Sequence, residues 1–153
     1  MKKLSVLLIV IIAAVAVPGN AQVSDETVLT YQVLTEDYDG LVESAMGLTP
    51  EQWKAFEPVF DDYKAAMHPV FEKRILLIKE FVKRQGSLTD AEARLALQTI
   101  LDIERDEWLT QRDFQHEFLK VIPPVKVLRF WQIENRMMML LMSGVAKDVP
   151  LAQ

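Results

Sequence analysis

The chain has 153 residues, enough for one domain with a buried core. It contains no cysteine, which excludes disulfides, zinc–thiolate sites, thiol nucleophiles and a lipid-modified N-terminal cysteine. The formal net charge of −5 argues against nucleic acid and anionic lipid as partners, because both attract concentrated Lys and Arg.

The first 21 residues are typical of a secretory signal peptide. Lys2 and Lys3 precede an apolar run over residues 4–17, and the small residues Gly19 and Ala21 follow it. The run is too short to span a bilayer comfortably. We therefore expect cleavage after Ala21, a single mature domain of residues 22–153 and no direct membrane anchor. Without the two lysines, 15 basic and 22 acidic residues remain, a net charge of −7.

The mature chain is expected to begin with a helix running from Glu26 to Met46. Its apolar residues recur at steps of three and four, as on one face of a helix. They are Tyr31, Leu34, Tyr38, Leu41 or Val42, and Ala45. Gly47 is predicted to end this helix in a left-handed conformation.

A second helix is predicted to start at once, at Leu48-Thr49-Pro50-Glu51-Gln52. Thr49 is a good N-cap with Gln52 as its capping-box partner, and Leu48 can pack on Trp53 as a hydrophobic staple. The apolar residues that follow hold a 3.5-residue repeat: Trp53, Phe56, Phe60, Tyr63, Met67, Val70, Leu77 and Phe81. Because Pro58 and Pro69 lie inside this helix, we expect curvature, or a break near His68-Pro69.

Two further helices follow a turn at Gly86. Thr89 and Glu92 form a second capping box, at the head of a helix that reaches Val121. Its apolar residues are Leu97, Ile100, Leu101, Trp108, Phe114, Phe118 and Val121. Pro123-Pro124 forces a turn into a last helix over about residues 125–146.

The predicted fold class is all-α: an elongated, cradle-like antiparallel hairpin of two long helices with a flanking helix at each end. At 1.5 Å per residue the two long helices are each about 50 Å in length. One short helix at each end cannot cover such lengths. Some apolar surface should therefore meet a second copy, giving a homodimer, or a client protein.

The segment Leu48-Thr49-Pro50-Glu51-Gln52 resembles the L-T-x-x-Q motif of the Spy/CpxP family of exported bacterial proteins. The similarity of layout covers residues 48–136, although the second family motif, expected near residues 121–131, is absent. The resemblance implies a periplasmic protein that pairs into a curved cradle and binds unfolding clients without ATP. Other members of the wider group sense envelope stress or metals.

No residue grouping in the sequence fits catalysis. The chain lacks a nucleophile elbow, a metalloprotease helix and a phosphate-binding loop, and its two histidines are too few for most such schemes. Adjacent acids such as Asp61 and Asp62 point in different directions on a helix. We expect a non-enzymatic protein without a cofactor.

A client-binding surface would combine large apolar groups with basic residues on one face. The candidates are Trp53, Phe56, Phe60 and Phe81 together with Arg74, Arg105 and Arg112. The alternative is a solvated face, in which acids between Asp102 and Asp106, and Asp113, pair with these bases across the hairpin.

Metal sensing through a membrane partner protein is the alternative function. Its candidate ligands are His68, His116, Met138 and Met142, since thioethers suit Cu(I). With the turn at Gly86-Ser87, His68 should face the neighbourhood of Asp106 and cannot share a metal with His116 of the same chain, although a dimer could pair the two histidines. Methionine also fills apolar cores, which gives these side chains a structural explanation.

Overall fold

The computed structural model of the chain describes residues 37–84, 86–149 and 151. This part of the protein is all-helical and contains no strand. Its helices are α2 (Tyr38–Met46), α3 (Pro50–Arg84), α4 (Asp90–Val121) and α5 (Pro124–Asp148). The expected signal peptide and the first part of the expected first helix lie outside the described residues.

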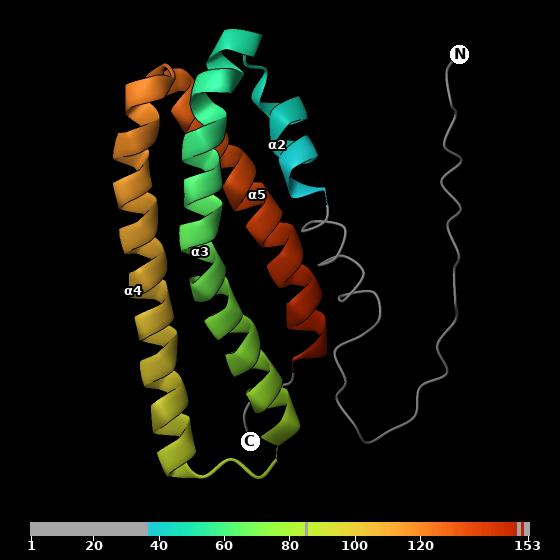
Figure 1. The fold of residues 1–153 in the computed structure, drawn as a ribbon. Helices are drawn as coiled ribbons and strands as arrows, with labels where there is room; N and C mark the ends of the chain where they lie inside the picture. The colour runs from blue at the N-terminus through green and yellow to red at the C-terminus, as the bar shows by residue number, and fades with distance from the viewer. Residues whose placement is uncertain (1–36, 85, 150, 152–153) are drawn as a thin grey trace, which may run out of the picture.

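The long helices α3 and α4 lie side by side and are joined at one end by the turn at Gly86 (Figure 1). At the other end a tight turn at Pro123 sends α5 back past α3. The short helix α2 packs against the first half of α5. None of the described helices offers a stretch long and apolar enough to cross a bilayer.

Helix α3 is continuous over 35 residues and passes both internal prolines. Pro58 and Pro69 are both exposed, so the backbone carbonyls that lose their partners at these positions can be hydrated. A break near His68-Pro69 does not occur.

Local capping accounts for the helix boundaries. Gly47 ends α2 with φ +56°, a conformation that costs glycine little because it has no Cβ. At the head of α3, the Gln52 amide donates to Thr49 Oγ1 at 3.2 Å and the Thr49 amide donates to Gln52 Oε1 at 3.1 Å. The predicted capping box of Thr89 and Glu92 is confirmed at the head of α4.

The core is an aromatic cluster at the end of the molecule farthest from Gly86. Phe56 of α3, Phe118 of α4 and Phe130 of α5 meet there, with ring centroids 4.8–5.5 Å apart. Val42 and Met46 of α2 complete it, and all five side chains are fully buried. This cluster ties all four helices together at one end.

The prediction of which apolar residues of α4 are buried is wrong for the first part of the helix. Leu97, Ile100, Leu101 and Trp108 are exposed, and Trp108 retains 58% of its surface. Ile103, which lay outside the predicted stripe, is buried instead. Among the described helices, α3 is the one that packs on this half of α4, so one face of α4 is covered and apolar residues on its other faces are exposed.

Replacing Phe130 by alanine should cost about 3–5 kcal/mol of unfolding free energy, because the ring is fully buried among three helices. Leu128→Ala on the same helix is the matched control, since Leu128 is 59% exposed and should change stability by less than about 0.5 kcal/mol. Urea denaturation measures both. Equal losses in the two variants would contradict the placement of the core.

Candidate functional site

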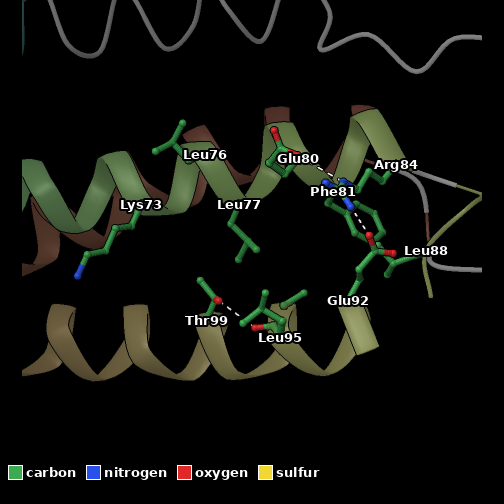
Figure 2. Close-up of a pocket in the computed structure, with 11 residues that line it drawn as sticks. Lys73, Leu76, Leu77, Glu80, Phe81, Arg84, Leu88, Glu92, Leu95 and Thr99 are labelled. Atoms are coloured by element: carbon green, nitrogen blue, oxygen red, sulfur yellow. Dashed lines mark hydrogen bonds and ion pairs between the residues drawn. The ribbon is translucent and has the colours of Figure 1, made fainter. Parts of the chain in front are cut away.

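A groove opens between α3 and α4 near the Gly86 turn, and we call it the tip groove (Figure 2). Its volume is about 390 Å³, within the range of small-ligand sites. Its lining is formed by Lys73, Leu76, Leu77, Glu80, Phe81, Arg84, Leu88, Glu92, Leu95, Ala96 and Thr99. Most of the lining is apolar, and the charged groups come from both helices.

The groove exists because the side chains of α4 are short where those of α3 are long. Ala96 and Thr99 leave space opposite Leu77, which points from α3 toward α4 in Figure 2. Thr99 Oγ1 donates to the Leu95 carbonyl at 2.9 Å, which satisfies the hydroxyl within its own helix. At the rim, Leu76 and Leu95 retain 61% and 68% of their surface. Large apolar side chains are therefore accessible on both sides of the opening.

Ion pairs between α3 and α4 mark the two ends of the groove. At the turn, Arg84 pairs with Glu92, the capping residue of α4, and also lies 3.5 Å from Glu80. The backbone amide of Thr89 lowers the pKa of Glu92, and Arg84 lowers it further. At the other end, Lys73 Nζ donates to Asp106 Oδ2 at 3.0 Å. These pairs neutralise the charges that border the apolar lining.

The three arginines predicted to bind clients are all paired with carboxylates. Arg74 is half-buried and pairs with Glu107 across the hairpin, where Arg74 Nη2 lies 2.5 Å from Glu107 Oε2. Arg105 pairs with Asp102 and Asp106 of its own helix. The arrangement matches the alternative of a solvated, internally paired face, and only Arg74 makes its pair across the hairpin.

Arg112 behaves differently from the other two arginines. It pairs with Asp113 at 2.7 Å, and its guanidinium lies 5.2 Å from the centre of the exposed Trp108 ring. Such a stacked cation adds a modest attraction and holds the indole against α4. Arg112 and Trp108 thus form a small mixed surface away from the tip groove lining.

The predicted aromatic binding residues separate into three environments. Phe56 and Phe60 are 0% and 1% exposed within the core, so in this conformation neither can touch a client. Trp53 is partly buried, with its ring centroid 5.6 Å from that of Phe56. Only Phe81 lines the tip groove. The 3.5-residue repeat that selected these aromatics marks the packed side of α3, which explains why most of them are not accessible.

Sequence reasoning missed Leu76 and Leu95 at the groove rim. Leu76 lies outside the apolar repeat of α3, and Leu95 was not assigned to the apolar face of α4. Their position outside the repeat could have identified them, because an apolar residue outside the repeat points away from the partner helix and remains accessible.

A second hollow of about 290 Å³ lies between α3 and α5. We call it the methionine hollow, and its lining comprises Tyr38, Tyr63, Lys64, Met67, His68, Phe71, Glu134, Met137, Met138 and Leu141. Among the candidate metal ligands it brings together His68 and Met138. The exposed His116 belongs to α4, and Met142 is not part of the lining.

The expectation that His68 faces the neighbourhood of Asp106 on α4 is wrong, because His68 lines the hollow between α3 and α5. Asp106 is bonded to Lys73, more than one helical turn farther along α3. His68 instead borders the methionine hollow, where its Nδ1 lies 3.8 Å from Glu72. Within the described part of the chain, no group of three or more His, Asp or Glu side chains is placed to hold a metal ion.

Glu134 is the polar centre of the methionine hollow, and sequence reasoning missed it. Tyr38 of α2 donates to Glu134 Oε1, and Tyr63 of α3 donates to Glu134 Oε2 at 2.9 Å. Burial raises the pKa of Glu134 despite these two donors, and the charge of Glu107 raises it further. Burial and the neighbouring carboxylate likewise raise the pKa values of Tyr38 and Tyr63, so both hydroxyls keep their protons.

Glu134→Gln should stabilise the protein at pH 7, and the gain should shrink as pH falls toward 4. The folded chain holds the Glu134 proton more tightly than the unfolded chain does. Stability is therefore lost as pH rises from the ordinary value of 4.5 through the raised folded pKa. The amide removes this titration and still accepts from a tyrosine hydroxyl.

Melting temperatures of native chain and variant from pH 4 to 8 measure this effect. Glu104→Gln on the exposed surface of α4 is the control for the change in net charge. A Gln variant less stable than the native chain throughout pH 5–8 would show that the tyrosines favour the charged carboxylate more than burial opposes it.

Comparison with known proteins found no matching family model, no matching curated protein and no matching solved structure. The function must accordingly be inferred from the residues and geometry of this chain.

Proposed function

We propose that this chain is an exported, non-catalytic binding protein of the bacterial envelope, similar to Spy and CpxP, that holds misfolding clients. The observation that carries the proposal is the tip groove, an apolar opening bordered by the accessible side chains of Leu76 and Leu95. The signal-peptide pattern and the Leu48–Gln52 motif support the periplasmic location. Reporting of envelope stress to a membrane sensor protein is compatible with the same surface.

The groove is suited to weak and reversible holding. Burying one leucine- or phenylalanine-sized side chain contributes about 1.5–3 kcal/mol. The volume of about 390 Å³ accommodates only a few such groups, and association itself costs several kcal/mol. A client segment would dissociate readily, so no ATP-driven release step is required.

Apolar contact, rather than charge, should dominate client binding. The charges beside the groove are already paired within the chain, as Arg84 with Glu92 and Lys73 with Asp106. A net charge of −7 after cleavage gives no general attraction for acidic clients. Binding should accordingly depend little on ionic strength, because paired surface charges contribute little net energy.

The outer face of α4 supports the proposal of a homodimer. Leu97, Leu101 and Trp108 share one side of this helix and are all exposed. A second copy covering this stripe would leave both tip grooves open. Two hairpins joined in this way would form the cradle-like arrangement.

Suppression of client aggregation tests the proposal. The native chain should reduce light scattering of a chemically unfolded client, and the double variant Leu76→Asp, Leu95→Asp should lose most of this effect. Carboxylates on both sides of the opening would oppose entry of apolar side chains. Both positions are exposed, so the fold should tolerate the change.

Leu128→Asp is the matched control, because Leu128 is equally exposed but lies on α5, away from the groove lining. It should suppress aggregation as well as the native chain does. No suppression by the native chain in molar excess, or equal loss in the control, would overturn the assignment of the tip groove.

A metal-responsive sensor is the second candidate function. The observation that favours it is that Met67, His68, Met137 and Met138 border one hollow, since thioethers and imidazole together suit Cu(I). Anaerobic titration with Cu(I) against a competing chelator measures the affinity, with Met137→Leu, Met138→Leu as the variant that removes two sulfurs at similar volume. Binding no tighter than micromolar, or binding unchanged in the variant, would rule out this site.

A further inference from the structure

One side of α4 carries seven exposed residues that are spaced symmetrically about Trp108. Counted from Trp108, the steps are four, three and four residues in both directions along the helix. Steps of this length keep side chains on one side of a helix. We call this set the α4 stripe, and it consists of Leu97, Leu101, Glu104, Trp108, Arg112, Gln115 and Leu119.

The apolar members of the α4 stripe are large and accessible. Leu97, Leu101, Trp108 and Leu119 retain between 41% and 62% of their surface. The side of α4 that packs in the hairpin is a different one, because the buried Ile103 lies five residues from Trp108 and thus about 140° around the helix. A further helix can therefore pack on the α4 stripe while α3 stays in place.

Glu104 is an exposed acid in the middle of this stripe. No base lies three or four residues from it in either direction, so it lacks the usual partner on its own helix. Among the described residues, no ion pair or hydrogen bond reaches its carboxylate. Arg112 follows eight residues later on the same side of α4, where it pairs with the adjacent Asp113 and lies near the Trp108 ring. The stripe thus carries one charge of each sign, at equal distances from Trp108.

We propose that two copies of the chain pair through the α4 stripe, with their α4 helices antiparallel and a two-fold axis beside Trp108. This proposal rests on the homodimer proposed above and specifies its interface. Each residue before Trp108 then faces the residue equally far after Trp108 in the other copy. Glu104 faces the partner's Arg112 at two places, one on each side of the axis. Leu97 faces the partner's Leu119, and the two Trp108 rings meet at the axis.

Charge complementarity selects the antiparallel orientation. Parallel pairing in register would bring the two Glu104 side chains together and also the two Arg112 side chains, and like charges in contact oppose association. The antiparallel arrangement replaces both repulsions by oppositely charged pairs.

The symmetry of the stripe favours a second copy over a client as its occupant. An isologous interface requires a surface that is complementary to itself, and the spacing about Trp108 meets this requirement. An unfolded client has no fixed arrangement of charges that could match both Glu104 and Arg112. A second copy provides both matches at once.

Charge-reversal variants test the pairing through sedimentation equilibrium. Glu104→Arg and Arg112→Glu should each raise the dissociation constant of the dimer several-fold, because each brings like charges together at two places. The double variant Glu104→Arg, Arg112→Glu keeps the native net charge and should recover most of this loss. A double variant as weak as the product of the two single effects would overturn the assigned pairing.

Trp108→Ala tests the centre of the interface in the same measurement. A tryptophan at the centre of an interface often dominates binding, so the dissociation constant should rise at least about tenfold. Leu128→Ala is the matched control, because Leu128 is equally exposed but lies on α5, and it should leave the constant unchanged. A native chain that stays monomeric at its highest soluble concentration, or equal effects of the two variants, would overturn the proposal.

Single cysteines determine the orientation, because the natural chain contains none. A thiol reagent that spans the usual 8–10 Å between packed helices should link Leu97→Cys chains to Leu119→Cys chains when the two variants are mixed. Neither variant should link to itself, since antiparallel pairing separates identical positions by about 33 Å along the helices. Self-linking of Leu97→Cys, or no linking in the mixture, would contradict this orientation.

The dimer and client binding can fail separately. A monomeric native chain that still suppresses client aggregation would overturn the dimer and leave client binding at the tip groove intact. Loss of suppression in Trp108→Ala, with a monomeric native chain, would assign the α4 stripe to clients and would also overturn the proposal. A dimer that fails to suppress aggregation would overturn the holding function alone.

Discussion

Contact among the rings of Phe56, Phe118 and Phe130 holds together the beginning of α3, the end of α4 and the beginning of α5. Their ring centroids lie 4.8–5.5 Å apart, close enough for the specific attraction between aromatic rings to add to the burial of their large surfaces. Most of the fully buried side chains gather at these coinciding ends. The tip groove lies at the Gly86 end of α3 and α4, whereas the methionine hollow borders the core at Tyr63.

Charged pairs determine how α3 and α4 align along the rest of the hairpin. Lys73 with Asp106 and Arg74 with Glu107 connect successive residues of the two helices. The first pair is exposed and contributes little stability, whereas the second is half-buried and would be costly to break by removing one partner. A shift by one turn would separate both pairs and leave Arg74 and Glu107 partly buried without partners. The polar middle of α4 thus selects one register of the two helices.

The all-helical fold, the turn at Gly86 and the caps at Gly47 and Thr89 follow from local chemistry, and the sequence predicts them for that reason. Local chemistry does not determine which residues of α4 are buried, so the sequence does not predict them. Periodicity shows that Trp108 and Ile103 are apolar positions on a helix, but not that a single neighbour covers α4 there and that Ile103 is the one that faces it. The burial of Glu134 could not be predicted from the sequence either, because its neighbours Asn135 and Arg136 make it resemble part of a solvated face. Its burial depends on Tyr38 and Tyr63 arriving from two other helices.

Glu134 lies between the core and the methionine hollow, because it bonds to the core residue Tyr63 and also lines the hollow. A carboxylate at this depth gives little net stability, because the cost of removing it from water offsets much of its hydrogen bonding. It does give specificity, since only one placement of α2 and α3 brings two hydroxyls to its two oxygens. Sliding α2 along α5 would leave the acid buried without donors, which costs more than loss of an apolar contact. Glu134 therefore fixes where α2 lies along α5.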